Sequence, residues 1–258
     1  MYEATAKTYD QYRNADGTLL QEIERRLTQR QEGRYLDVGC GSGNYTIALL
    51  QRGWGMEGID LSPEMLAQAR AKAPNCRWRE GDMYSLPFDP DTFDGVVTVN
   101  TLHYASKGLI PVFQEMGRVL KPGAQAVVFA LALEQSLQFW LGHYFPFFRA
   151  RAYKTLLPMD ALVSAFKEAS FREVSVEPFF VTQKTSDFFT YACKYRPHLF
   201  LNPAIRAGMT PLRLPQHAEE IRIGCERLEK DLFSGAIYQV INEHESGIGE
   251  GLFICGKK

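Results

Sequence analysis

Short strand-like segments alternate with amphipathic segments along the first half of the chain. Apolar residues spaced three and four apart predict helices at 18–30, 44–51, 63–72 and 109–120. Between and after them lie strand candidates at 34–38, 56–59, 77–80, 95–99 and 126–132, with a Lys-Pro-Gly turn predicted at 121–123. Ser62 as N-cap and Pro63 at the first helical position mark the start of the third helix. Strands alternating with helices predict a parallel sheet covered by helices on both faces.

The alternation loosens beyond residue 132. Residues 134–156 and 185–235 are predicted as two helical insertions. Between them the pattern predicts a helix at 159–170 and a strand at 172–181, and a final strand follows at 251–255. Residues 238–243 fit a helix or a strand equally well. We therefore predict one α/β domain over residues 1–258, with its regular core at 31–132.

Composition narrows the class of partner. The 258 residues carry 29 Lys and Arg against 30 Asp and Glu, a net charge of −1, which argues against DNA as a partner. Five scattered cysteines without a CxxC pair argue against disulfides and against a metal site, and predict a cytoplasmic protein. The beginning of the chain lacks a secretion signal. Its longest strongly apolar stretch, 126–133, falls far short of the ~18 residues that stable membrane insertion needs.

The most informative segment is the glycine loop Leu-Asp-Val-Gly-Cys-Gly-Ser-Gly at 36–43, which leaves a predicted strand and enters a predicted helix. Its spacing is GxGxG, whereas a nicotinamide-dinucleotide fingerprint would require Gly or Ala where Asn44 stands. Asp60 ends the next strand 21 residues after Gly39, where a carboxylate can accept hydrogen bonds from ribose hydroxyls. The pattern indicates a nucleoside cofactor and disfavours a nicotinamide dehydrogenase.

Four motifs in order resemble the class I S-adenosylmethionine (SAM)-dependent methyltransferases, and most closely the small-molecule branch that includes quinone-biosynthesis enzymes. They are the glycine loop, Gly-Ile-Asp-Leu-Ser-Pro-Glu-Met at 58–65, Glu-Gly-Asp-Met at 80–83 with the Leu-Pro-Phe and Phe-Asp that follow, and Leu-Lys-Pro-Gly at 120–123. The resemblance implies a Rossmann-like, doubly wound, seven-stranded sheet whose last strand is antiparallel, with helical lid insertions over the acceptor site. It implies SAM as cofactor and S-adenosylhomocysteine (SAH) as product.

The resemblance also assigns roles to individual residues. Asp60 would bind the ribose hydroxyls, and Leu61 would pack on the adenine unless it is simply part of the core. Asp82 would accept a hydrogen bond from the adenine amino group, with the Met83 backbone beside the ring, although Asp82 also suits a plain turn. Residues that would face the methionine part are Asp37, Asn100 and the loop backbone of Gly39, Cys40, Gly41 and Gly43. No base neighbours the Cys40 thiol in sequence, so its side chain is interpreted as packing.

Candidate catalytic groups follow the fourth predicted strand, where Asn-Thr-Leu-His-Tyr occupies 100–104. His103 is of a type that can remove a proton from an acceptor, with Tyr104 beside it, but it could equally only bind the cofactor or pack. The segment lacks the two prolines of the motif that many DNA and glutamine methyltransferases carry. The N-terminal stretch with Tyr2, Tyr9 and Tyr12 resembles the mobile segment that covers the cofactor in related enzymes, and residues 1–30 are predicted as this lid and a helix. Tyr9 is the candidate cofactor contact, or it is a surface aromatic residue without a role.

The segment 139–148 contains six aromatic residues in ten. It could form an apolar wall over the acceptor, with His143 or Tyr144 as its polar group, or could only pack between an insertion and the core. A membrane-surface role is disfavoured because the segment has no basic polar face. Phe188, Phe189 and Tyr191 would form the opposite wall or belong to the core.

These features predict a methyltransferase acting on a small aromatic or apolar molecule. A non-catalytic SAM-binding protein and a protein or RNA acceptor remain as alternatives. The sequence does not indicate an oligomeric state.

Overall fold

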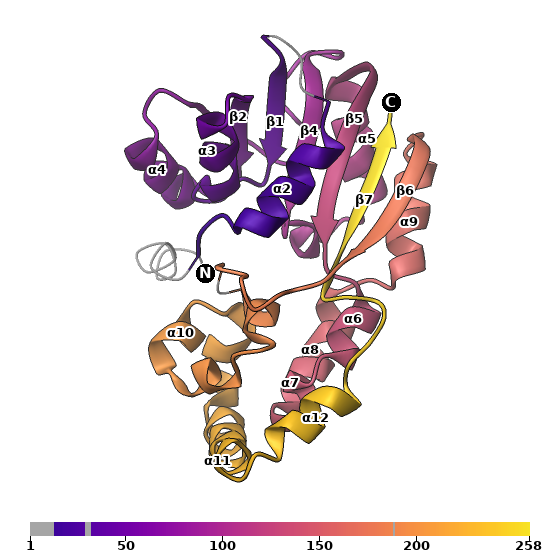
Figure 1. Ribbon diagram of the computed structural model, residues 1–258. Coiled ribbons are helices and arrows are strands. Elements are labelled where there is room, and N and C mark those ends of the chain that lie inside the picture. The colour runs from indigo at the N-terminus through magenta and orange to yellow at the C-terminus, as the bar shows by residue number, and fades with distance from the viewer. Residues whose placement is uncertain (1–12, 29–31, 188) are drawn as a thin grey trace.

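The computed structural model describes residues 13–28, 32–187 and 189–258, and its centre is one seven-stranded sheet (Figure 1). The strands lie in the order β3-β2-β1-β4-β5-β7-β6. Only β7 runs antiparallel to its neighbours, since β1 to β5 pair in parallel. This arrangement confirms the Rossmann-like sheet with an antiparallel final strand. The strand bounds are β1 (Arg34–Val38), β2 (Gly55–Asp60), β3 (Arg77–Glu80), β4 (Phe93–Val99), β5 (Leu120–Ala130), β6 (Arg172–Phe179) and β7 (Gly251–Lys257).

Helices cover both faces of the sheet, so a strand such as β5 contributes side chains to two hydrophobic cores, one on each face. Its residues Val127 and Phe129 face the core that contains α2 (Gly17–Arg26) and α3 (Asn44–Gln51). The alternate residues Ala126 and Val128 face the core that contains α5 (Ile110–Val119) and α9 (Met159–Glu168). This two-residue alternation places apolar side chains on both faces, as a sheet covered on both sides requires.

Helix boundaries follow the local capping chemistry. The predicted start of α4 (Pro63–Lys72) is confirmed, because the Ser62 Oγ accepts a hydrogen bond from the Met65 backbone N–H at 3.2 Å. The helix predicted over 18–30 is too long. It ends at Arg26, because Leu27 adopts an extended conformation (φ −88°, ψ 147°) while its N–H still bonds back to Ile23 and Glu24.

The strand predicted from residue 126 begins six residues earlier, at Leu120. The predicted turn at 121–123 lies inside β5 as an irregularity, since the pairing jumps from Phe93 with Leu120 to Gly95 with Gln125. Gly123 takes a φ of +73° there, a conformation that glycine adopts without strain. The motif therefore predicted a turn-like backbone at Gly123 correctly, but the prediction that the strand begins after this turn was wrong.

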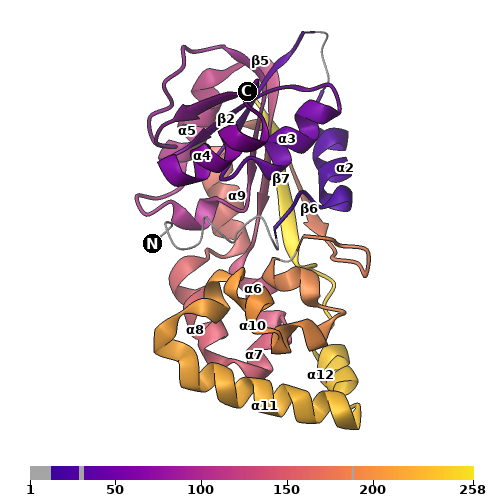
Figure 2. The ribbon, with the colours of Figure 1, turned by 90° about the vertical axis from the view of Figure 1, so that its left-hand side faces the viewer.

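Two groups of helices gather beyond the carboxyl ends of the parallel strands (Figures 1 and 2). Most of their residues lie in the segments 134–156 and 185–235, and α12 (Ile237–Glu243) extends the second group past the predicted end and shows that residues 238–243 are helical. The first group is α6 (Leu133–Gln138), α7 (Leu141–Tyr144) and α8 (Pro146–Thr155). The second group is η2 (Thr190–Cys193), η3 (Pro197–Leu201), α10 (Pro203–Ala207), η4 (Thr210–Arg213), η5 (Pro215–His217), α11 (Ala218–Ser234) and α12 (Ile237–Glu243). Within the described ranges, no helix is long and apolar enough to cross a membrane.

The aromatic segment 139–148 packs the two helical groups together. Its six aromatic side chains are all buried in one core cluster with residues of the second group. The Trp140 Nε1 donates a hydrogen bond to the Lys194 carbonyl at 3.2 Å, and the Phe147 ring stacks on His217 with centroids 4.3 Å apart. These contacts favour the packing interpretation for most of the segment.

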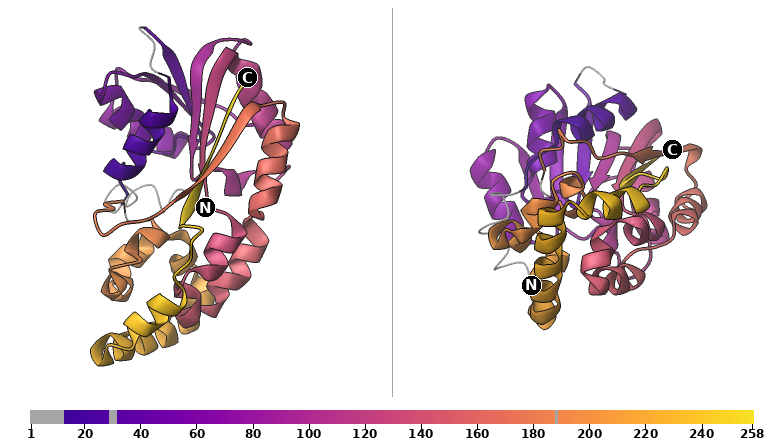
Figure 3. Two further views of the ribbon diagram at one scale, coloured as in Figure 1. Left: turned by 45° about the vertical axis from the view of Figure 1, so that its right-hand side comes forward. Right: turned by 60° about the horizontal axis from the view of Figure 1, so that its bottom comes forward.

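A buried ion pair fixes the second group to the sheet. The Lys194 Nζ lies 2.7 Å from Glu250 Oε1, and both side chains are almost completely buried. The other carboxylate oxygen, Oε2, accepts the Val181 backbone N–H at 2.9 Å. Glu250 directly precedes β7, which lies between β5 and β6 (Figure 3), so this pair joins the helical layer to the strand that completes the sheet.

Candidate active site

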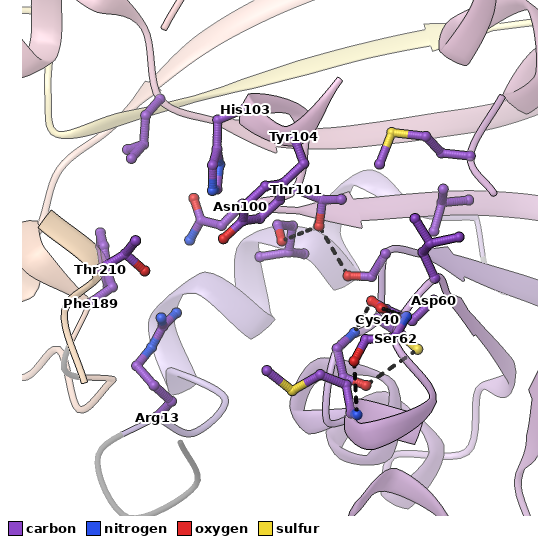
Figure 4. Close-up of a pocket in the computed structure, with 18 of the residues that line it drawn as sticks. Arg13, Cys40, Asp60, Ser62, Asn100, Thr101, His103, Tyr104, Phe189 and Thr210 are labelled. Carbon is purple, nitrogen blue, oxygen red and sulfur yellow. Dashed lines mark hydrogen bonds between the residues drawn. The ribbon is translucent and has the colours of Figure 1, made fainter. Parts of the chain in front are cut away.

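A cavity of about 1000 Å³ opens at the carboxyl ends of β1, β2 and β4. Its walls come from the glycine loop, the segments after β2, β3 and β4, residues 13–14, and both helical groups. Ligand binding at this edge is the rule for open α/β sheets, because the strand order reverses there and leaves a crevice. Figure 4 shows the side chains that gather around it.

The glycine loop presents bare backbone to this cavity. Gly39, Gly41 and Gly43 all have positive φ angles, of +74°, +56° and +81°. A Cβ on Gly41 would meet no atom within 4 Å, so this stretch of backbone is open to close approach by a ligand. A Cβ on Gly39 would instead lie 2.2 Å from Thr101 Cγ2, because the Thr101 Oγ1 donates to the Gly39 carbonyl and holds the end of β4 against the loop.

Gly39→Ala should therefore destabilise the protein. A left-handed conformation costs an L residue roughly 1–2 kcal/mol, and an overpacked contact costs roughly 1–3 kcal/mol. We expect a loss of about 2–4 kcal/mol in the free energy of unfolding, measured by chemical denaturation. Gly41→Ala is the matched control, since it carries the conformational strain without the clash and should lose only about 1 kcal/mol. Equal losses in the two variants would contradict the clash.

Asp60 joins the loop to the start of α4. Its Oδ2 accepts the Gly41 N–H at 2.7 Å, and its Oδ1 accepts the Ser62 N–H at 2.9 Å. Burial raises the pKa of Asp60, and the backbone hydrogen bonds oppose that rise. Leu61 follows it with 66% of its surface exposed on the cavity wall. The alternative that Leu61 belongs to the core is wrong, because a core residue would be buried.

Asp37 lies deeper, under the loop. Its Oδ2 accepts a hydrogen bond from the Thr46 hydroxyl at 2.6 Å. Burial raises the pKa of Asp37 to about 7, and repulsion from Asp60 acts in the same direction. A bound cation would favour the carboxylate form, because an opposite charge nearby lowers the pKa of an acid.

Asn100 supplies an unsatisfied acceptor. Its backbone is held at φ +53° with its N–H on the Phe129 carbonyl, while its side-chain Oδ1 is buried without a hydrogen-bond partner. A buried polar atom of this kind costs free energy unless a ligand pairs with it. The donors of an ammonium or hydroxyl group suit this oxygen, so the site fits the methionine part of SAM.

Asp82 and Met83 also line the cavity, after β3. The Asp82 side chain accepts the Tyr84 N–H at 3.0 Å, and its carbonyl accepts the Ser85 N–H. This is turn geometry, yet one carboxylate oxygen is left for a ligand. Asp82 can therefore be a turn residue and a hydrogen-bond acceptor for a ligand at the same time.

The Cys40 side chain behaves as a packing residue. Burial raises the pKa of its thiol well above the usual value, and the carboxylates of Asp37 and Asp60 oppose a thiolate further. A thiol that stays protonated is a poor nucleophile. In the described part of the chain, no group of three or more His, Cys, Asp or Glu residues is arranged to hold a metal ion.

His103 and Tyr104 lie on η1 (Leu102–Tyr104), with ring centroids 4.0 Å apart, and both line the cavity. The imidazole is exposed to the cavity, while protein surrounds it on its other sides. This confinement lowers the pKa of His103 to about 4, and the positive charges of Arg151 and Arg13 act in the same direction. His103 is accordingly neutral at physiological pH.

The structure does not bring every predicted residue to the cavity. His143 is absent from its lining and instead lies 3.4 Å from the Arg227 side chain on α11. Of the aromatic segment only Phe148 reaches the cavity, whereas the predicted opposite wall contributes Phe189 and Tyr191. Tyr9 and Phe188 lie outside the described residues.

Sequence reasoning missed several lining residues, foremost Arg13, Arg151 and Thr210. The Arg13 guanidinium makes two contacts with the Asp187 carboxylate, at 2.6 and 3.1 Å, across 174 residues of sequence. Neither arginine belongs to a motif. The only signal for Arg151 was its place in the basic run directly after the aromatic segment.

The strand order, the glycine loop and the acid after β2 define an α/β enzyme with a nucleoside cofactor site. The profile of a family described as "Methyltransferase domain" matches residues 36–123. A demethylmenaquinone methyltransferase from Shouchella clausii is 31% identical over 170 residues, which cover 61% of this chain and 68% of that protein. The malonyl-[acyl-carrier protein] O-methyltransferase of Erwinia billingiae is 30% identical over 160 residues, 62% of this chain and 63% of that enzyme.

A solved structure agrees over nearly the whole chain. A putative methyltransferase from an antibiotic biosynthesis pathway of Anabaena variabilis superposes with a TM-score of 0.84 at 28% identity, covering 96% of this chain and 100% of that one. This chain belongs to the class I SAM-dependent methyltransferases, and SAM is its cofactor.

Proposed function

We propose that this enzyme methylates a small molecule with a large apolar or aromatic part. The observation that carries the proposal is the far wall of the cavity, opposite the glycine loop. Both helical groups contribute to it, and most of the side chains they place there are apolar. They include Phe148, Leu156, Phe189, Tyr191 and Met209. Pockets of this composition bind apolar ligands and orient them with a few polar groups. The relatives support the proposal, since several are named as demethylmenaquinone or 2-phytyl-1,4-naphtoquinone methyltransferases.

Within this proposal the polar half of the cavity holds the cofactor. Asp60 accepts from the ribose hydroxyls, and Asp82 accepts from the adenine amino group. Asn100 and Asp37 face the methionine part, where the backbone of Gly39 to Gly43 allows close approach. When bound, SAM supplies an electrophilic methyl group on a cationic sulfonium. The chain's own contribution is to align the acceptor with that group and to exclude water.

The experiment measures SAH formation by the purified protein with a panel of acceptors. The panel contains phenols, naphthoquinols, aryl carboxylic acids and alkyl amines, beside a cell-derived protein fraction and total RNA. We expect turnover with members of the small-molecule set only. Turnover confined to the protein or RNA fraction would overturn the proposal, and SAH binding without turnover on any acceptor would favour the non-catalytic alternative.

His103 has a proposed role that this assay can examine. If its neutral imidazole accepts a proton from the acceptor, His103→Gln should lower kcat by about 10²- to 10³-fold and leave SAH affinity unchanged. The wild-type rate should show no acid limb between pH 6 and 8, since the imidazole loses its proton near a pKa of about 4 and stays neutral above it. A loss below threefold in His103→Gln would leave the group a packing or cofactor contact only.

A further inference from the structure

The acceptor side of the cavity carries two guanidinium groups. Arg13 reaches it from the N-terminal segment, and Arg151 from α8. Figure 4 shows the Arg13 side chain directed toward the same space as Asn100, Phe189 and Thr210. Both arginines act electrostatically on His103, so their charges lie near the place where the acceptor would react.

The charge of Arg13 is neutralised within the protein. Its guanidinium makes a two-point contact with the carboxylate of Asp187, a fully buried residue. Burial raises the pKa of Asp187, while the Arg13 charge and hydrogen bonds oppose that rise and favour the ionised form. This pair is internal, and it leaves Arg13 little capacity for an anionic ligand.

Arg151 is different. In residues 13–28, 32–187 and 189–258, no carboxylate forms a salt bridge with its guanidinium and no acceptor forms a hydrogen bond with it; the Thr155 hydroxyl donates to its backbone carbonyl and not to its side chain. Its neighbours on α8 do not share this position, because Arg149 contacts His244 at 3.1 Å and Lys154 is exposed outside the cavity. A half-buried guanidinium beside the apolar wall of the cavity gains most from an anionic partner.

We propose that the methyl acceptor is a carboxylic acid whose carboxylate binds Arg151, with its apolar remainder against the Phe148, Phe189 and Tyr191 wall. This deepens the proposed function and rests on it. One guanidinium without a partner supplies one positive charge, which matches a monoanion better than a phosphate dianion. The planar fork of an arginine also fits a carboxylate with two parallel hydrogen bonds.

The test measures binding directly, so it does not depend on turnover. SAH-saturated protein is titrated calorimetrically with 4-phenylbutyrate, with its neutral amide, and with phenylpropyl phosphate. We expect the acid to bind about tenfold or more tightly than the amide. Arg151→Gln should abolish this preference and Arg151→Lys should keep part of it, while Lys154→Gln on the same helix should keep all of it. SAH affinity and thermal unfolding, unchanged in each variant, show that the fold is intact.

Equal affinity for acid and amide in the wild-type protein would overturn the proposal, as would a preference that survives Arg151→Gln or an absence of binding by all three probes. Tighter binding of the phosphate than of the acid would overturn the assignment of a carboxylate. A carboxylate preference without methyl transfer to any small molecule would instead refute the proposed function and leave the Arg151 site standing.

Discussion

Asp60→Ala should lower the affinity of the protein for SAM and SAH by two to three orders of magnitude. In the proposed complex the Asp60 carboxylate accepts a hydrogen bond from each of the two ribose hydroxyls. Hydrogen bonds to a charged group contribute roughly 1.5–3 kcal/mol each. The same carboxylate fixes the Gly41 N–H at 2.7 Å, so the loop would also lose its anchor. About 3–4 kcal/mol in total corresponds to roughly 10²- to 10³-fold in Kd. Isothermal titration calorimetry with SAH measures this change in Kd.

The matched control for this variant is Glu80→Gln. Glu80 ends the adjacent strand β3, is exposed and does not line the cavity, so its replacement removes an acidic charge at the same sheet edge without touching the site. We expect its Kd for SAH to remain within twofold of wild type. If Asp60→Ala also stayed within threefold while remaining folded, the ribose role of Asp60 would be rejected.

Lys194→Met should lower the free energy of unfolding by about 3–5 kcal/mol, the range found when one partner of a buried ion pair is removed. In the wild-type protein the Lys194 Nζ lies 2.7 Å from the Glu250 Oε1. The substitution leaves the Glu250 carboxylate buried without this positive charge beside it. Burial by itself would lower the pKa of Lys194, but its hydrogen bonds to Glu245 and Glu250 raise it overall, so the ammonium form prevails across the neutral range. Denaturant unfolding followed by circular dichroism gives the value.

Two further variants separate the buried contact from the exposed one. Glu245 also contacts Lys194 at 2.8 Å, but its side chain is half exposed, so Glu245→Gln should cost less than about 1 kcal/mol. The double variant Lys194→Met/Glu250→Gln should recover part of the loss, because no buried charge then lacks a partner. A loss below 1 kcal/mol in Lys194→Met would show that water reaches Glu250 in solution.

The sheet and the cofactor half of the site could be predicted from sequence because their signals are local. A helix cap such as Ser62, a glycine loop and an acid at the end of a strand each act through neighbours a few residues away. Central strands such as β1 and β4 also stand out as short apolar runs, so their order along the chain could be predicted even where a strand end was misplaced, as at Leu120.

The acceptor half could not be predicted in the same way, because its contacts join distant parts of the chain. Arg13 meets Asp187 across 174 residues, and Arg151 joins His103 in the lining of one cavity only once α8 is in place. The aromatic segment gave an ambiguous signal for a related reason. A buried core and a ligand-binding wall require the same side chains, and only the packing partners of Trp140 and Phe147 distinguish them.

The position of β7 between β5 and β6 has a consequence for the order in which the chain folds. β6 ends at Phe179, and its partner in the sheet, β7, begins at Gly251. The ribosome must therefore synthesise the whole second helical group before β6 can pair with β7. Until then the edge of β5 exposes unpaired backbone groups, and such an edge can pair with another chain. Closing so long a loop also slows folding. We infer that newly synthesised protein passes through an aggregation-prone stage that ends when β7 inserts.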